Sequence, residues 1–307
     1  MATVTQAATS PVEPYRLPEL LHDIRLLDLL ELSGSTVQAS QFLSLSQPSV
    51  SRRYRSLAQD FGLVRDLRQR QRCRFGTSET MRWLRLGCRA HRLAAGFARI
   101  GTDLLHAPLL AGMAGLLPTP VRFRSVHTWA ALVRDGVVDA ALMSGLEIAA
   151  AGSHLDWSDL QWLELGALPL ALALPPGREL DASAFPPVLV PQRTITPGLH
   201  RTLRNQDLSL RTAGNSCTTA EQWQSKAATH GWAIPVVRHP AGWEQTREGW
   251  PVRPLPLSLH ASIGVLLPAE RSTAKLLRLV LDAPSRRINA TRSALSQEET
   301  TDSALQR

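Results

Sequence analysis

The sequence predicts an α/β protein in which an N-terminal winged helix-turn-helix and a linker helix precede a two-lobed domain. Three observations predict this fold class. Two short helical patterns joined by a tight turn occur near the N-terminus, a basic amphipathic stretch follows them, and short apolar runs alternate with helical stretches over the remaining two thirds. At 307 residues with 44% hydrophobic positions, the chain can bury the cores of two or three domains.

Composition excludes several classes of protein. No run approaches eighteen apolar residues, and the opening MATVTQAATSPVEPYR lacks both the basic start and the apolar core of a secretory signal. The cysteines are Cys73, Cys88 and Cys217, an odd number without Cys-x-x-Cys spacing, so neither a disulfide framework nor a zinc site is indicated. We expect a soluble cytoplasmic protein with no metal, no cofactor and no membrane partner.

Positive charge is concentrated in the first third of the chain. Residues 1–100 contain 15 arginines, no lysines and 8 acidic residues, hence a net +7, while the whole chain carries +8. Concentrated arginine attracts a polyanion through counterion release and forms fork-like contacts with phosphates and guanine edges. A general bias towards arginine would explain the lack of lysine but not this location, so double-stranded DNA is the predicted partner.

Two short helices near the N-terminus are predicted from periodicity and caps. Residues 1–17 lack periodicity and are expected to form a flexible arm. A first helix of about three turns begins at Glu19 and ends where Ser33-Gly34-Ser35 supplies turn and cap chemistry. A second covers Thr36–Leu43, and Ser44-Leu45-Ser46 turns into a third. This arrangement is the skeleton of a helix-turn-helix.

The predicted third helix has two different faces. Ser46 is its expected N-cap, Pro48 lies in its first turn, and it ends after Asp60. The apolar face comprises Val50, Tyr54 and Leu57, and the polar face Gln47, Ser49, Arg52, Arg53 and Ser56. Such a helix can pack its back on the scaffold while its front lies in a major groove. A merely solvated polar face has the same pattern and is the alternative.

The segment that follows, residues 61–76, has the composition of a basic wing. It alternates weakly between polar and apolar positions, as two strands alongside a groove would. Its five arginines are Arg65, Arg68, Arg70, Arg72 and Arg74. A disordered basic loop is the alternative.

A linker helix is predicted for residues 77–96, capped by Thr77-Ser78-Glu79. Its apolar stripe has the 3, 4, 3, 4 spacing of a coiled-coil seam and comprises Trp83, Leu86, Ala90, Leu93 and Phe97. A neighbouring face carries Arg82, Arg85, Arg89 and Arg92. We expect the apolar stripe to pair two subunits and the arginines to stay solvated or approach DNA. The alternative is a helix packed on its own chain.

The C-terminal two thirds, residues 97–288, predict a parallel sheet from a βαβαβ order. The expected elements of its first part are strand 98–101, helix 107–117, strand 121–126, helix 128–134 and strand 138–143. Those of the second part are strands 168–174 and 187–190, helix 218–229, strands 232–237 and 262–267, and helix 274–281. Crossing strands would join lobe 1, residues 97–162 and 262–288, to lobe 2, residues 163–261. Residues 289–307 form a polar tail, expected to be disordered.

These residues resemble one family. The string Ser46-Gln47-Pro48-Ser49-Val50-Ser51-Arg52, with Leu29-Leu30-Glu31-Leu32 before it and Leu57 and Gly62 after it, is similar to the DNA-binding end of LysR-type transcriptional regulators. Residues 99–102, 132–142 and 230–235 are similar to that family's effector-binding domain. The resemblance implies a DNA-binding domain at 18–76, a dimerising linker helix and a two-lobed, periplasmic-binding-protein-like effector domain.

The resemblance also assigns residues to DNA. It implies that Gln47, Pro48, Ser49 and Arg52 contact DNA in the groove. It implies that Ser35, Thr36, Ser51 and Arg53 lie near phosphates. The sequence departs from the family pattern at Ser40, Ala58 and Arg65-Asp66, so the recognition helix is better matched than the wing.

An effector is expected in the cleft between the lobes, where strands end and helices begin and where backbone N–H groups favour an anion. The candidate residues are Thr102, Asp103, His127, Thr128, Thr194, Thr196, Thr218 and Thr219. Threonine at a helix start is also an ordinary N-cap. Asp103 would repel an anionic effector unless Arg193 or His127 neutralises it. A cationic effector, or none, is therefore the alternative.

The lack of common catalytic motifs argues against an enzyme. The sequence contains no Gly-rich phosphate loop, no Gly-x-Ser-x-Gly elbow and no His-Glu-x-x-His. We expect a transcription regulator, a homodimer or homotetramer, that binds an inverted repeat in promoter DNA and responds to a small-molecule effector. The alternatives are a DNA-binding protein of the same fold without an effector, and a two-lobed ligand-binding protein.

Overall fold

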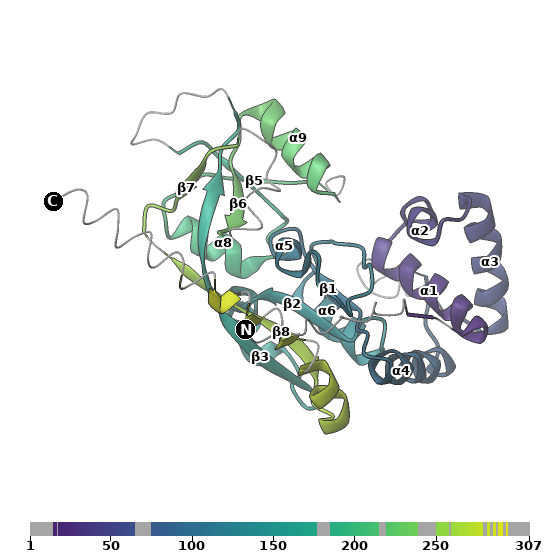
Figure 1. Cartoon of the computed structure of the whole chain (residues 1–307). Helices are drawn as coiled ribbons and strands as arrows, with labels where there is room; N and C mark the ends of the chain where they lie inside the picture. The colour runs from purple at the N-terminus through teal and green to yellow at the C-terminus, as the bar shows by residue number, and fades with distance from the viewer. Residues whose placement is uncertain are drawn as a thin grey trace, which may run out of the picture.

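Three helices at one end of the molecule, a fourth helix beside them and two α/β lobes make up the architecture (Figure 1). The computed structural model describes residues 15–16, 18–64, 75–176, 185–214, 219–238, 250–257 and 259–278, and short pieces at 281–282, 285–286, 288–290 and 293. The prediction of a mixed α/β fold with an N-terminal helix-turn-helix, a linker helix and two lobes is confirmed.

The N-terminal helices form where their caps predict. A short turn, η1 (Glu19–Leu21), leads into α1 (His22–Ser33), followed by α2 (Thr36–Leu43) and α3 (Gln47–Asp60). Gly34 ends α1 with a φ of 70°, which only glycine adopts readily, and the hydroxyls of Ser35 and Ser46 accept N–H groups in the first turns of α2 and α3. The core between them contains Ile24, Leu27, Leu30, Ala39, Val50, Tyr54 and Leu57. In Figure 1, α3 lies on the side of this core away from the lobes.

The linker helix α4 (Glu79–Ala94) begins at its predicted cap but buries the face that was expected to be exposed. Arg85, Arg89 and Arg92 are 3%, 5% and 1% exposed. The expectation that these arginines stay solvated or approach DNA is therefore wrong for three of the four, and Arg82 alone is exposed. On this face, the alternative of packing on the same chain holds.

Two buried carboxylates explain this burial. Asp28 of α1 accepts hydrogen bonds from Arg85 Nε at 2.7 Å and from Arg99 Nη1 at 2.6 Å. Asp139 lies 2.6 Å from Arg92 Nη2. Buried charges persist when they are paired in this way. Helical periodicity did not show these pairs because the carboxylates lie 57 and 47 residues away from the α4 arginines.

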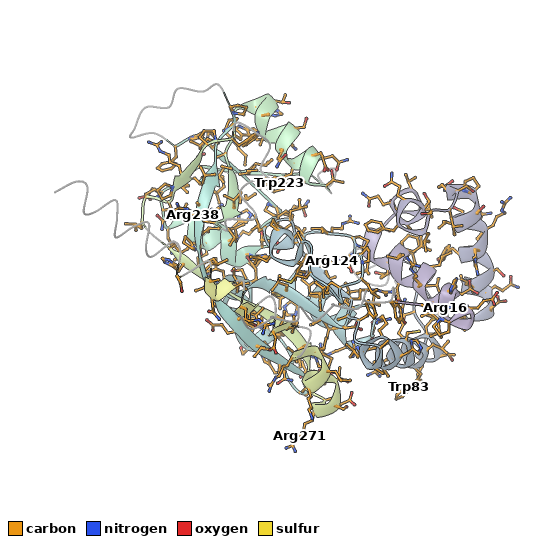
Figure 2. The ribbon with its side chains drawn as sticks, in the orientation of Figure 1. Arg16, Trp83, Arg124, Trp223, Arg238 and Arg271 are labelled. Carbon is orange, nitrogen blue, oxygen red and sulfur yellow. The ribbon has the colours of Figure 1, made fainter. Side chains whose placement is uncertain are left out.

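The apolar stripe of α4 is divided between interior and surface. Trp83 is 60% exposed and points away from the body of the molecule (Figure 2). Ala90 is also exposed, whereas Leu93 is buried in a hydrophobic cluster that extends through both lobes. The exposed part of the stripe is therefore left for contact with another molecule or with solvent.

One sheet, ordered β1-β2-β8-β3-β6, runs through both lobes. In lobe 1, β1 (Ile100–Thr102) and β2 (Ala140–Ser144) are parallel, and β8 (His260–Pro268) is antiparallel to β2. The long strand β3 (Leu160–Ala173) pairs first with β8 and then, in lobe 2, with β6 (Ile234–Val237) and β7 (Val252–Pro254). Strand β3 thus crosses from one lobe to the other, as the crossing-strand arrangement predicts.

Helices and a smaller sheet complete the lobes. Those of lobe 1 are α5 (Ala107–Leu110), α6 (Val126–Arg134), α7 (Gly145–Ala151) and the turn η2 (Gly152–His154). Lobe 2 contains α8 (Pro197–Arg204), α9 (Ala220–His230) and the parallel pair β4 (Val188–Val190) and β5 (Leu210–Thr212). Residues 271–278 form the helix that was predicted at 274–281.

Some predicted elements of lobe 1 are wrong. The helix expected at 107–117 ends at Leu110, because Gly112 and Gly115 adopt φ values of 69° and 76° that end a right-handed helix. The strand expected at 121–126 is absent, and residues 121–125 have no regular structure. The helices α7 and α8 and the strands β5 and β7 were not predicted. Because the strand at 121–126 is absent, no strand lies between β1 and β2 along this described part of the chain.

Candidate functional site

The polar face of α3 is exposed, as a DNA-reading helix requires. Gln47, Pro48, Arg52 and Arg53 are exposed, Ser49 and Ser51 are half-buried, and Val50, Tyr54 and Leu57 form the buried back. Tyr54 anchors this back, because its hydroxyl donates to the Phe75 carbonyl at 3.0 Å and its ring meets the Phe75 ring edge-on. The helix is held rigidly while its front remains accessible.

Side-chain hydrogen bonds organise the start of α3. Gln47 Nε2 donates to Thr36 Oγ1 and to Ser51 Oγ, both at 3.0 Å. This amide therefore connects α2 to α3. It also holds Thr36 and Ser51, which are predicted to lie near phosphates, next to Gln47, which is predicted to contact DNA in the groove. Ser35, which is also predicted to lie near a phosphate, uses its hydroxyl to accept the Gln38 N–H as the cap of α2.

Arg53, a predicted phosphate contact, has an internal partner. Its Nε donates to a carboxylate oxygen of Asp23 in α1, and the two side chains are 50% and 37% exposed. Exposed ion pairs of this kind contribute about 0–1 kcal/mol. A DNA phosphate can therefore compete with Asp23 for the guanidinium.

The arginine-rich part of the predicted wing, residues 65–74, lies outside the described residues. The residues on either side of it, Val64 and Thr77, form an antiparallel bridge with N···O distances of 3.2 Å in both directions. The two ends of the segment are thus held side by side, which is what a two-stranded wing requires.

Thr102 and Asp103, at the end of β1, bind groups of their own lobe. Thr102 Oγ1 donates to the Leu142 carbonyl at 3.1 Å. Asp103 Oδ1 accepts the backbone N–H groups of Leu105 and His106 and lies 2.7 Å from His106 Nδ1. The partner of Asp103 in the structure is therefore His106, rather than Arg193 or His127 as the sequence suggested.

His127 and Thr128 lie inside the first turn of α6, because Ser125 is its N-cap. His127 is exposed. Thr128 is buried, and its N–H donates to Ser125 Oγ at 3.3 Å. Of the two, His127 alone offers an accessible side chain to a ligand.

The start of α8 holds a carboxylate that sequence reasoning missed. Glu147 of α7 accepts the backbone N–H groups of Gly198 at 3.0 Å and Leu199 at 2.8 Å. Burial raises the pKa of Glu147 to about 7. The free N–H groups at this helix start, which could bind an anion, are thus occupied by the protein's own side chain, which links α7 to lobe 2. The feature of the sequence that could have indicated this role is the position of Glu147, an acidic residue three positions after the fully buried strand β2.

The two threonines expected beside this position differ. Thr194 is exposed. Thr196 is 4% exposed and is the N-cap residue of α8, and its hydroxyl makes no hydrogen bond with any described residue. Of the candidate residues near β1, α6 and α8, Thr102, Asp103 and Thr128 therefore bind groups of the protein itself, whereas His127 and Thr194 are exposed.

The remaining candidates lie at the start of α9. Thr219 caps this helix and forms a capping box with Gln222, and Thr218 lies outside the described residues. Thr219 also lines a cavity of about 360 Å³. Among the described candidate residues, it is the one that does so.

Three parts of the chain form the walls of this cavity, which we call the junction cavity. The helices α1 and α2 contribute Leu32, Ser33, Gln38, Gln41 and Phe42. Lobe 1 contributes Leu104, Leu105, Ala107, Pro108 and Thr119–Arg122. Lobe 2 contributes Thr219, Ala220, Trp223, Gln224 and Ile234–Val237. The sequence predicts Thr219 as a ligand contact between the lobes, but it does not predict the contribution of α1 and α2, because these helices are distant from α9 along the chain.

Neither a metal cluster nor a membrane-spanning helix is found within the described ranges. No group of three or more His, Cys, Asp or Glu side chains in those ranges is placed to hold a metal ion. No described helix is long and apolar enough to span a bilayer.

Comparisons with known proteins give structural likenesses only. No protein-family model and no curated protein sequence matches the chain. A cysteine mutant of OxyR from Corynebacterium glutamicum is similar with a TM-score of 0.48 and 17% identity, over 94% of this chain and 97% of that one. HinK, a LysR family transcriptional regulator from Pseudomonas aeruginosa, is similar with a TM-score of 0.44 and 18% identity, over 87% of this chain and 98% of that one. ArgP from Mycobacterium tuberculosis is similar with a TM-score of 0.44 and 18% identity, over 88% of this chain and 98% of that one.

Proposed function

We propose that this chain is a LysR-type transcription regulator that binds promoter DNA through α3 and whose DNA binding is modulated by a small molecule. The observation that carries the proposal is the geometry of α3. Its apolar back is buried and anchored by Tyr54, Gln47 and Arg52 are exposed, and the helix lies on the side of the N-terminal core away from the lobes (Figure 1). The amide and guanidinium groups of these two side chains are suited to base edges and phosphates.

The proposal assigns residues 18–76 to DNA binding, 77–96 to the linker and 97–288 to the effector domain. A single recognition helix reads only a few base pairs, so a two-fold dimer on an inverted repeat is the expected form. The exposed aromatic ring of Trp83 on α4 supports pairing through the linker helix. The buried arginine face of the same helix is unavailable for that role.

The effector part of the proposal draws on the two lobes and the cavity between them. Strand β3 passes from lobe 1 to lobe 2, so a ligand that contacts both lobes can change their relative position. We expect such a change to alter the spacing or bend of bound DNA. Energy transfer between dyes at the ends of a bound promoter fragment, with and without candidate metabolites, tests this. A bend that never changes would contradict modulation while leaving DNA binding intact.

A DNA-binding protein without an effector is a second candidate, and one observation favours it. Glu147 already occupies the anion position at the start of α8. A carboxylate effector could bind there only by displacing a side chain that accepts two backbone hydrogen bonds.

Recovery of genomic DNA bound to the purified protein, at two salt concentrations, tests the DNA-binding function. The test variant is Gln47→Ala with Arg52→Ala, and Arg201→Ala removes one exposed positive charge in lobe 2 as a control. We expect a shared inverted repeat that is recovered with the wild type and with the control but lost with the double variant. Salt-sensitive binding without a shared motif would contradict the proposal.

A further inference from the structure

We propose that the junction cavity binds a compact apolar molecule that carries one anionic group, held between α2 and both lobes. Its regulatory consequence rests on the proposed function, whereas its location and ligand class rest on the lining residues. At about 360 Å³, the cavity falls within the range of roughly 300–1,000 Å³ of small-molecule sites.

The lining is mostly apolar and includes aromatic rings from two separate parts of the chain. Trp223 of α9 is 4% exposed, and its ring lies 5.2 Å from that of Phe123, so this wall is fixed. Figure 2 shows Trp223 on the part of α9 that extends towards the N-terminal helices. Phe42 of α2 is 38% exposed at the other wall. An apolar ligand between these rings would remove apolar surface from water on both sides.

The charged group of the lining sets the sign of the ligand. Among the described lining residues, Arg122 is the one ionisable side chain, and none is acidic. Its Nη1 donates to the Ser33 carbonyl at 2.8 Å, which fixes the guanidinium beside the end of α1. The N-terminus of the eleven-residue helix α9 also opens on the cavity at Thr219 and Ala220. Both features favour an anion and disfavour a cation.

A ligand in this cavity would act on the DNA-binding helices directly. Phe42 and Gln38 belong to α2, and α2 also carries Thr36, which Gln47 of α3 contacts. Occupancy of the cavity would therefore bias the docking of α1 and α2 on the lobes. Because coupling between two binding equilibria is reciprocal, DNA would change the affinity for the ligand by the same factor as the ligand changes the affinity for DNA.

Two dyes with the same rings and different charge test the ligand class. Anilinonaphthalene sulfonate is an apolar anion, and N-phenyl-naphthylamine lacks the sulfonate. We expect the full chain to bind the anion at one site per chain. We expect Arg122→Gln to weaken binding of the anionic dye about tenfold and binding of the uncharged dye less than twofold. We expect Arg122→Lys to bind both dyes as the wild type does. If Arg122→Gln weakens the binding of the two dyes equally, the negative charge proposed for the ligand is overturned.

Two cavity-filling variants test the location. Ala220→Trp places a ring at an exposed lining position, and Ala107→Phe fills the opposite wall from a half-buried one, so at least one variant is expected to fold. Leu257→Ala is the control for dye on exposed apolar surface, because Leu257 is 64% exposed outside the cavity. We expect at least a tenfold loss of anion binding in each folded filling variant and no loss in the control. Unchanged binding in a folded filling variant would overturn the site.

The same samples separate this inference from the proposed function. If the wild type binds promoter DNA but the filling variants bind the dye normally, the cavity site is wrong and the regulator stands. If filling abolishes dye binding but the wild type recovers no specific DNA, the ligand site stands and the proposed function fails.

Discussion

Arg92 and Asp139 form a two-point ion pair inside the molecule, with Nη2 at 2.6 Å from Oδ1 and Nε at 3.2 Å from Oδ2. The same carboxylate lies 3.6 Å from Arg89 Nε and accepts the backbone N–H of Arg99 at 2.7 Å. Asp139 is fully buried. It therefore offsets part of the charge that Arg89 and Arg92 of α4 bring into lobe 1, and it fixes the linker helix to that lobe.

Asp139→Asn is expected to lower the free energy of unfolding by about 3–5 kcal/mol. The amide keeps the shape of the side chain but leaves the Arg92 charge buried without a counter-ion. Chemical denaturation followed by circular dichroism measures the change. Asp159→Asn is the matched control, because it breaks the partly exposed pair with Arg134 and is expected to cost about 0–1 kcal/mol. Similar costs in the two variants would contradict the role given to Asp139.

Asp23→Asn is expected to raise the affinity for promoter DNA about two- to fivefold, a gain of roughly 0.5–1 kcal/mol. The carboxylate of Asp23 holds Arg53, a predicted phosphate contact, and the asparagine side chain releases it. Fluorescence anisotropy with a labelled promoter fragment measures the affinity. Asp60→Asn removes the same charge from the last residue of α3 and is the control. An equal gain in both variants would show that net charge alone acts.

The N-terminal helices could be predicted almost to the residue because their ends depend on local chemistry. Ser35 and Ser46 cap α2 and α3 through N–H groups three residues farther on, and Pro48 fits the first turn of α3. The polar and apolar faces of α3 likewise follow from spacing alone. This is the part of the candidate site that the sequence defines best.

The linker face and the junction cavity could not be predicted, because distant residues determine them. The arginines of α4 have the pattern of a solvated face, and only the position of Asp28 and Asp139 makes it a buried one. The segment 121–125 has the composition of a strand, but Arg122 and Arg124 donate instead to carbonyl groups at the end of α1. Tertiary contacts therefore override local propensity at both places.

Glu147 is expected to make the stability of the protein depend on pH. Burial disfavours its charged form and raises its pKa from 4.5 to about 7, although the Leu199 and Gly198 N–H groups act in the opposite direction. The folded chain therefore holds this proton more tightly than the unfolded chain. The stabilisation is fully present below about pH 4.5 and is lost as the pH rises through about 7, a change on the order of 3 kcal/mol.

Glu147→Gln removes this titration and keeps a side chain of similar shape. Thermal unfolding of the variant and the wild type at about pH 5 and about pH 8 measures the effect. The Tm of the variant relative to that of the wild type should be higher at about pH 8 than at about pH 5. Glu164→Gln, an exposed position on β3, controls for the loss of a charge. A difference in Tm that is the same at both pH values would contradict the raised pKa.

Gly198→Ala is expected to lower the free energy of unfolding by about 1–3 kcal/mol or more, through a clash between α7 and α8. A Cβ at this position would overlap the Leu146 carbonyl oxygen and lie 2.5 Å from the carbonyl carbon, and backbone atoms cannot turn aside as a side chain can. Gly87→Ala is the matched control, because a Cβ there meets nothing within 4 Å on α4. Removing a glycine from a helix interior should raise the free energy of unfolding by about 0.5–1 kcal/mol. Because the Gly198 N–H is one of the two that hold Glu147, the alanine variant should also change the pH dependence of Tm, whereas the Gly87 variant should leave it as it is. A loss of stability without any change in that pH dependence would separate the packing of α8 from the environment of the carboxylate.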